Sequence, residues 1–198
     1  MATIILAGGQ STRMGRDKAG LELRGSTILQ ALAARFGREL GPVIVAARRG
    51  QKVELEGASV VRDVHPGCGP LGGLHAGLEA SPDDENLLVA CDMPFADPEL
   101  GAHLLSLLDD HDAVVPLIER GPEPLFAAYG KSCLPQAETS IGARELSMRS
   151  FLDRIDTVHV LETELSEFDP DLRSFLNINT PEDYEKALTT LDKLGADG

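Results

Sequence analysis

The stretch TIILAGGQSTRMGRDK, residues 3–18, joins a short apolar strand to a glycine-rich loop that carries the cations Arg13, Arg16 and Lys18. Glycines allow a sharp turn and let backbone N–H groups approach a ligand closely. Together with Arg13 and Lys18, such N–H groups predict a cradle for phosphates. The spacing matches neither GxxxxGK(S/T) nor GxGxxG, which excludes a Walker A loop and disfavours a dinucleotide-binding dehydrogenase. A solvated turn is the alternative interpretation, but a strand and three glycines in one segment with Arg13 and Lys18 argue against it.

Around this loop, short apolar runs alternate with segments of helical periodicity. Strands are expected at residues 3–6, 43–47, 59–61, 87–90, 113–118, 125–129 and 157–161, and helices at 28–40, 70–79, 98–108, 138–152 and from 181 onward. This alternation predicts an α/β fold, a three-layer Rossmann-like sandwich with a mostly parallel central sheet. Ligands of such sheets bind beyond the carboxyl ends of the strands, which points to the loops after Leu6, Val61 and Ala90.

The chain ends in the helix with the clearest start signal. Thr180 is expected to cap it, with Pro181 in the first turn and Asp183 at the third position. The length of 198 residues is close to that of one ordinary domain. We therefore expect a single domain over residues 1–193 and a frayed tail over residues 194–198.

Composition excludes several classes of protein. Lys and Arg number 18 and Asp and Glu 32, and the net charge of −14 argues against binding nucleic acid or an anionic membrane. The sequence shows neither an apolar stretch long enough for a membrane span nor the pattern of a signal peptide. Cys68, Cys91 and Cys133 are odd in number and form no CxxC pair, which predicts free thiols and a cytoplasmic location.

Five blocks of sequence carry a family resemblance. They are LAGGQSTRMGRDK (6–18), GPLGGLHAGL (69–78), ACDMPF (90–95), PLFAAYGK (124–131) and FLNINTPEDYEKA (175–187). In this order, and over nearly the whole chain, they resemble the molybdenum cofactor guanylyltransferases, which are nucleotidyltransferases similar to sugar-nucleotide pyrophosphorylases. The resemblance implies a fold of the nucleotide-diphospho-sugar transferase type. It also implies transfer of GMP from GTP to the terminal phosphate of molybdopterin, with release of pyrophosphate and formation of the guanine dinucleotide cofactor.

The resemblance further implies a GTP site and a Mg²⁺ site at the strand ends. The expected GTP contacts are Leu6, Ala7, Gly8, Gly9, Ser11, Arg13, Gly15, Lys18, Asp63, Gly72 and Asp92. Of the three expected catalytic residues, Lys18 is assigned to the triphosphate, Arg13 to the leaving pyrophosphate and Asp92 to the metal. A carboxylate at the end of a parallel strand suits Mg²⁺. From the residues alone, Asp92 is equally well a helix or turn cap, and Asp63 could be a solvated loop acid.

On the acceptor side, the resemblance implies that Arg144, Asn177 and Asn179 bind molybdopterin. Amides pair with pterin edges and arginine with the terminal phosphate. Turn chemistry before the last helix is the alternative for the two asparagines. The attacking phosphate has a second pKa near 6, so it is already ionised at neutral pH and no catalytic base is needed. His65 and Cys68 share a loop, but no second nearby pair completes a metal site.

Two positions bear on the choice of base. Gly8 stands where related cytidylyltransferases have alanine, which leaves room for a purine, and Ala46 stands where some guanylyltransferases have asparagine. The alternatives are therefore a cytidylyltransferase acting on molybdopterin, a nucleotidyltransferase for another phosphorylated acceptor, and a non-catalytic nucleotide-binding partner protein. Transient contact with proteins that deliver or receive the cofactor is also expected.

Overall fold

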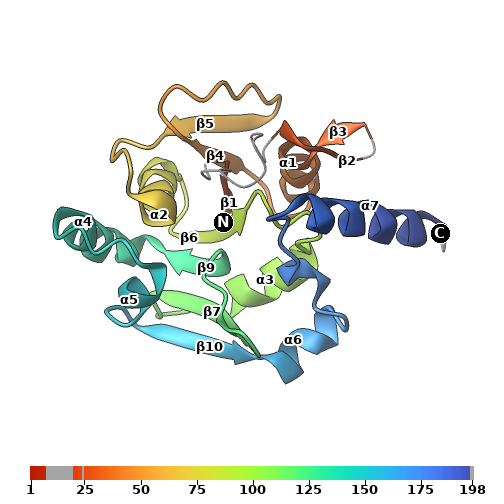
Figure 1. The fold of residues 1–198 in the computed structure, drawn as a ribbon. Helices are drawn as coiled ribbons and strands as arrows, with labels where there is room; N and C mark the ends of the chain where they lie inside the picture. The colour runs from red at the N-terminus through yellow and green to blue at the C-terminus, as the bar shows by residue number, and fades with distance from the viewer. Residues whose placement is uncertain (8–19, 24, 197–198) are drawn as a thin grey trace.

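The computed structural model describes residues 1–7, 20–23 and 25–196 (Figure 1). Its strands are β1 (Ala2–Leu6), β2 (Glu22–Leu23), β3 (Ser26–Thr27), β4 (Val43–Ala47), β5 (Ala58–Arg62), β6 (Glu85–Ala90), β7 (Ala113–Ile118), β8 (Gly121–Pro122), β9 (Phe126–Gly130) and β10 (Thr157–Leu161). Its helices are α1 (Ile28–Glu39), α2 (Gly69–Ala80), α3 (Pro98–Ser106), α4 (Leu134–Gly142), α5 (Met148–Leu152), α6 (Glu162–Phe168) and α7 (Pro181–Ala196), with 3-10 turns η2 (Lys131–Cys133) and η3 (Arg173–Phe175). Helix α7 continues past residue 193, where the tail was expected to begin, and residues 197 and 198 lie outside the described residues.

The central sheet is mixed but mostly parallel, as predicted. Its strand order is β10-β7-β9-β6-β1-β4-β5, with β8 paired to β7. Strand β1 pairs in parallel with β4 and β6, and the β4–β5 and β7–β10 pairs are also parallel. Strand β9 runs antiparallel to both β6 and β7, which the alternation of strands and helices did not predict. The short strands β2 and β3 form a separate hairpin that the sequence patterns also missed.

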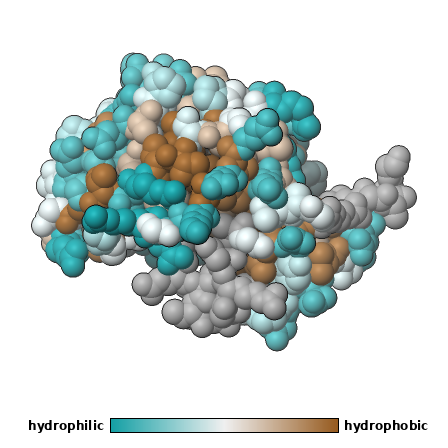
Figure 2. Space-filling view, turned by 90° about the horizontal axis from the view of Figure 1, so that it is seen from above, coloured by the Kyte–Doolittle hydropathy of each residue, from teal (hydrophilic) through white to brown (hydrophobic). Residues whose placement is uncertain are grey.

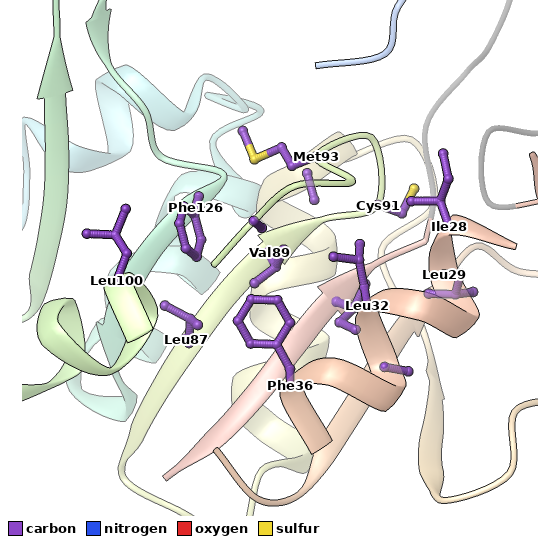
Figure 3. Close-up of a cluster of buried hydrophobic side chains, with 14 of the residues drawn as sticks. Ile28, Leu29, Leu32, Phe36, Leu87, Val89, Cys91, Met93, Leu100 and Phe126 are labelled. Carbon is purple, nitrogen blue, oxygen red and sulfur yellow. The ribbon is translucent and has the colours of Figure 1, made fainter. Parts of the chain in front are cut away.

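Helices cover both faces of the sheet, which gives the three predicted layers (Figure 1). Successive strand residues point to opposite faces, so Ile5 packs with α1 and α3 while its neighbour Ile4 packs with α2. On the α1 face, the ring of Phe36 meets that of Phe126 edge-on at a centroid distance of 6.4 Å (Figure 3). The sheet is therefore buried between two apolar layers, which directs attention to the strand ends as the place for a ligand.

Helix α2 lies unusually close to β1. A Cβ atom at Gly77 would lie 2.4 Å from Ile4 Cγ2, and one at Gly73 would lie 2.7 Å from Leu6 Cδ2. Larger side chains at these two positions would push the helix off the strand. The glycines of the 69–78 block thus serve tight helix-on-sheet packing, and they bring the start of α2 to the end of β1.

The helix expected over residues 138–152 is instead two helices. Helix α4 begins earlier, at Leu134, and the chain leaves helical geometry at Arg144, whose φ of 60° lies in the left-handed region. Helix α5 starts after Ser147, whose hydroxyl accepts a hydrogen bond from the backbone N–H of Ser150. A left-handed arginine has no strong sequence signal, so periodicity alone merged the two helices.

The start of α7 and the state of the cysteines agree with the predictions. Thr180 Oγ1 accepts from the Asp183 backbone N–H at 3.1 Å, and Asp183 Oδ2 accepts from the Thr180 N–H at 2.9 Å. All three cysteines are buried, and none of them forms a disulfide. Within the described ranges, we find no helix long and apolar enough to cross a bilayer.

One edge of the sheet is only partly covered. Strand β5 is the last in the strand order, and Val53, Leu55 and Val60 lie half-buried against the α1 side of the core. Seen from the side that carries β5 in Figure 1, hydrophobic residues gather among hydrophilic ones (Figure 2).

Candidate active site

The carboxyl ends of β1, β4, β5 and β6 lie side by side. In register, Leu6 pairs with Ala46 and with Ala90, and Ala46 pairs with Val61. Strand β1 lies between β4 and β6, and the helices that follow β1 and β5 cover opposite faces of the sheet. This is a topological switch point, where open α/β sheets leave a crevice for ligands. The three loops expected to bind ligand therefore start at one crevice.

The glycine-rich loop leaves β1 at this crevice. The Ala7 N–H donates to the Ala46 carbonyl at 3.0 Å, and the Ala7 carbonyl accepts from Gln51 Nε2 at 3.0 Å, so its starting point is fixed. Leu6 and Ala7 are both buried at the strand end. The other predicted residues of this loop lie outside the described residues, namely Gly8, Gly9, Ser11, Arg13, Gly15 and Lys18.

Asp63 and Gly72 meet on the β5 side of the crevice. The Asp63 N–H donates to the Ala47 carbonyl at 3.0 Å, and one carboxylate oxygen accepts from the His65 N–H at 2.7 Å. A Cβ atom at Gly72 would lie 2.9 Å from Asp63 Oδ2 and 3.0 Å from Cys68 Cβ. The Asp63 carboxylate thus stabilises the turn that follows β5. Because Gly72 has no side chain, this carboxylate can lie directly against the start of α2.

Asp92 follows β6 at the centre of the crevice. The helix-cap role considered for it belongs to Asp97, whose side chain accepts from the Glu99 N–H at 2.7 Å at the start of α3. The Asp92 carbonyl instead accepts from the Ile178 N–H at 2.8 Å. This bond joins the end of β6 to the segment between η3 and α7, although the two are far apart in sequence.

The two predicted asparagines lie on that segment. Asn177 and Asn179 flank Ile178, so the bond to Asp92 brings both residues near the aspartate that the sequence analysis assigned to the metal. The Asn177 side-chain oxygen is buried without a hydrogen-bond partner in the described part of the chain. The Asn179 N–H donates to Asp183 Oδ2 at 3.0 Å, a backbone bond that leaves the role of the Asn179 side chain open.

Arg144 lies in a different pocket. It lines a hollow between the loop after β5 and the end of α4, together with His65, Cys68 and Glu138. Asn177 lines another pocket, beside α7. The residues predicted for the acceptor are therefore divided, with the asparagines at Asp92 and the arginine on the Asp63 side.

Arg120 and Glu123 are additional residues at this edge that the sequence patterns did not single out. Arg120 Nη2 lies 2.6 Å from Glu123 Oε2 and 2.6 Å from the Phe175 carbonyl oxygen. Burial raises the pKa of the Glu123 carboxyl; Arg120 opposes this shift and the nearby charge of Asp92 adds to it. Glu123 directly precedes the 124–131 block and pairs with Arg120 three residues earlier, whereas Asp92 and Phe175 are brought to this pair only by the fold.

The carboxylate oxygens of Asp92 are the kind of ligand that a hard divalent cation prefers. Mg²⁺ is commonly held by one or two carboxylates together with substrate phosphates. Asp92 and Glu123 carry like charges that repel each other, and a cation between substrate phosphates and Asp92 would reduce that repulsion. In the described ranges, no group of three or more His, Cys, Asp or Glu residues could hold a metal ion alone. The arrangement therefore fits an ion shared with a phosphorylated substrate.

Comparison with known proteins gives consistent matches over almost the full chain. The family model described as the MobA-like NTP transferase domain matches residues 3–159. A molybdenum cofactor guanylyltransferase from Syntrophotalea carbinolica is 34% identical over 191 residues, covering 93% of this chain and 89% of its own. A probable molybdenum cofactor guanylyltransferase from Pelotomaculum thermopropionicum is 35% identical over 184 residues, covering 93% and 90%. The crystal structure of molybdopterin-guanine dinucleotide biosynthesis protein A from Archaeoglobus fulgidus superposes with a TM-score of 0.86 and 29% identity, covering 98% of this chain and 100% of its own.

Proposed function

The chain belongs to the family of MobA-like NTP transferases, and on that premise we propose that it transfers GMP from GTP to the terminal phosphate of molybdopterin. The products are pyrophosphate and the guanine dinucleotide cofactor. Membership confirms the expected enzyme class, a nucleotidyltransferase. The observation that carries the proposal is the bond from Ile178 to Asp92, because it joins the proposed acceptor segment to the strand end where the triphosphate would lie.

In this proposal, GTP lies over the end of β1. Gly8, Gly9, Ser11 and Gly15 give the backbone of the phosphate loop, and Leu6, Ala7, Asp63 and Gly72 line the nucleoside side. Lys18 and Arg13 neutralise the triphosphate and the leaving pyrophosphate. One unit charge 4 Å from another contributes about 4 kcal/mol at an effective dielectric of 20. Two such side chains can therefore dominate the local field despite the net charge of −14.

Catalysis then consists of alignment and charge stabilisation. An oxygen of the acceptor phosphate attacks the α-phosphorus of GTP and forms a new P–O bond. The bond from the α-phosphorus to the bridging oxygen of the β-phosphate breaks, and pyrophosphate leaves with that electron pair. The attacking oxygen is already ionised at neutral pH, so no side chain has to remove a proton. Asn177 and Asn179 orient the acceptor beside Asp92. Arg144 lies in the pocket on the Asp63 side, so in this proposal it binds a part of the acceptor away from the reacting centre, and not the terminal phosphate that the resemblance assigned to it.

Mg²⁺ is part of the proposal as the cofactor. Asp92 would hold it together with phosphate oxygens, and it would supply charge neutralisation at the reacting phosphates. We also propose that the reaction takes place in the cytoplasm, with transient contact to proteins that deliver or receive the cofactor, and without nucleic acid or a membrane as partner.

The choice of nucleotide has one specific rival. Ala46 is buried at the end of β4, and its carbonyl bonds Ala7 at the start of the phosphate loop. An alanine there cannot supply the side-chain amide of some guanylyltransferases. A cytidylyltransferase acting on molybdopterin is therefore the second candidate.

A nucleotide panel tests the proposal. Purified protein receives molybdopterin and Mg²⁺ with GTP, CTP, ATP or UTP in separate reactions, and pyrophosphate release is measured. We expect release with GTP, and about 100-fold less in Asp92→Asn, the size of loss seen when one stabilising group leaves a reacting centre. Asp110→Asn is the matched control, because Asp110 is exposed in the turn before β7. Release with CTP alone would favour the second candidate, and full activity of Asp92→Asn would remove the metal assignment.

A further inference from the structure

The hairpin after β7 carries an ion pair that also bonds the acceptor segment. Arg120 and Glu123 lie on either side of β8, and Arg120 Nη2 contacts both Glu123 Oε2 and the Phe175 carbonyl oxygen at 2.6 Å. The Arg120 side chain is 51% exposed, whereas that of Glu123 is only 12% exposed. The buried partner therefore fixes the guanidinium from the side of the sheet, while the arginine reaches across to the next segment.

The hairpin itself is firmly attached. The Glu123 N–H donates to the Pro116 carbonyl at 2.9 Å, which closes the turn, and the Ala90 N–H donates to the Leu125 carbonyl at 2.9 Å, which joins it to β6. Arg120 thus extends from a base that is continuous with the sheet. Because the hairpin is bonded to β6, a Phe175 carbonyl that moved away from Arg120 would also move away from the end of β6.

The segment from Phe175 to Ile178 is held at both ends. At one end, Arg120 bonds the Phe175 carbonyl, and the buried Phe175 ring packs against Phe126 at a centroid distance of 5.8 Å. At the other end, the Ile178 N–H bonds the Asp92 carbonyl at 2.8 Å. Between these anchors lie only Leu176, which is 47% exposed, and Asn177. Within the segment, the Leu176 N–H also donates to the Arg173 carbonyl at 2.9 Å. The bonds from Arg120 and to Asp92 tie the two sides of Asn177 to different strand ends of the sheet.

We infer that Arg120 is a positioning residue for the acceptor: through the Phe175 carbonyl it holds Asn177 in place beside Asp92. Glu123 keeps the guanidinium oriented toward that carbonyl. The inference rests on the proposed function, because it takes the Asn177 segment as the acceptor side of the site. Arg120 acts through this segment, so its loss changes the use of the phosphorylated acceptor more than the use of the nucleotide.

The test combines two measurements on Arg120→Ala, Arg120→Lys and the control Arg38→Ala. Arg38 is also an exposed arginine paired with a carboxylate, that of Glu39 at 2.9 Å, but it lies at the far end of α1. Hydrogen exchange of the Ile178 amide reports the anchoring without any reaction. Steady-state kinetics with molybdopterin and GTP separate the KM of the acceptor from the KM of the nucleotide.

In Arg120→Ala we expect Ile178 exchange and the acceptor KM each to rise about tenfold, the low end for losing a hydrogen bond from a charged group. The GTP KM should stay within about twofold, since Arg120 does not reach the nucleotide in this arrangement. Arg120→Lys keeps a charged donor and should recover part of both effects, and Arg38→Ala should show neither.

Unchanged Ile178 exchange in Arg120→Ala, or equal increases in both KM values, would overturn the inference. If Arg120→Ala does not fold, Arg120→Met decides instead, because it keeps the unbranched stem of the side chain but removes the donor to the Phe175 carbonyl, and wild-type values for both readouts in Arg120→Met would overturn the inference. A wild-type protein that shows no transfer to molybdopterin overturns the proposed function instead. Faster Ile178 exchange in Arg120→Ala would then still support the anchoring itself, so the two failures are distinguishable.

Discussion

Replacing Gly72 with alanine probes the nucleotide side of the site with little disturbance elsewhere. The new Cβ atom would lie 2.9 Å from Asp63 Oδ2, 3.0 Å from Asp63 Oδ1 and 3.0 Å from Cys68 Cβ. Because carbon and oxygen atoms do not approach so closely, the Asp63 carboxylate has to move by a few tenths of an ångström. That movement strains its 2.7 Å bond from the His65 N–H.

The expected energies nearly cancel in the folded protein. Straining the hydrogen bond at half-buried Asp63 destabilises the fold by about 1 kcal/mol. Replacing glycine by alanine inside a helix stabilises the fold by up to about 1 kcal/mol. The free energy of unfolding should therefore change by less than about 1 kcal/mol. Loss of one hydrogen bond between Asp63 and the nucleoside should weaken GTP binding about tenfold.

Urea unfolding and calorimetric titration with GTP measure the two quantities. Gly37→Ala is the matched control, because residue 37 is exposed in α1 and its Cβ atom would make an ordinary 3.4 Å contact with Val43. It should raise stability by up to about 1 kcal/mol and leave GTP affinity unchanged. Wild-type GTP affinity in a folded Gly72→Ala protein would refute the placement of Asp63 at the nucleoside.

Three further predictions concern stability and thiol chemistry. Thr180→Ala removes the cap of α7 and should lower the free energy of unfolding by about 1 kcal/mol in urea titrations; an unchanged midpoint would contradict the cap. Hydrogen bonds from the backbone N–H of Asn179, and from Thr180, hold the pKa of Asp183 below its usual value of 3.8. Its stabilisation is therefore present at neutral pH and is lost as pH falls below about 4, so the stability difference between wild type and Asp183→Asn should shrink there. Burial raises the pKa of the Cys133 thiol to about 12, so iodoacetamide at pH 8 should modify this residue only after unfolding, as peptide mass analysis can check.

Local patterns predicted the parts of the fold whose cause is local. The buried runs of β4 and β7 and the capped start of α7 follow from apolar content and from Thr180 and Asp183. The antiparallel direction of β9 depends on which strands it lies between, and no residue within β9 specifies that. The break at Arg144 is a single backbone conformation that asparagine or glycine would have signalled more clearly.

The candidate site also has parts that local sequence patterns predicted and parts that depend on contacts between distant segments. Sequence patterns placed Asp63 and Asp92 just after strands and Gly72 in the helix after residue 69. The parallel pairing of β5, β4, β1 and β6 brings the two aspartates to one crevice, and the start of α2 lies beside Asp63. The Arg120–Glu123 pair was missed because its meaning depends on Phe175, which is 55 residues away from Arg120 in sequence. Contacts that link distant segments become visible only in the folded chain.

The most direct measurement is a crystal structure of the protein with Mg²⁺ and a GTP analogue that cannot be cleaved between its α- and β-phosphates. The triphosphate should lie against residues 8–18 with Lys18 and Arg13 on its oxygens, and the ion should contact Asp92. A nucleotide bound elsewhere, with that segment free of phosphate, would contradict the account.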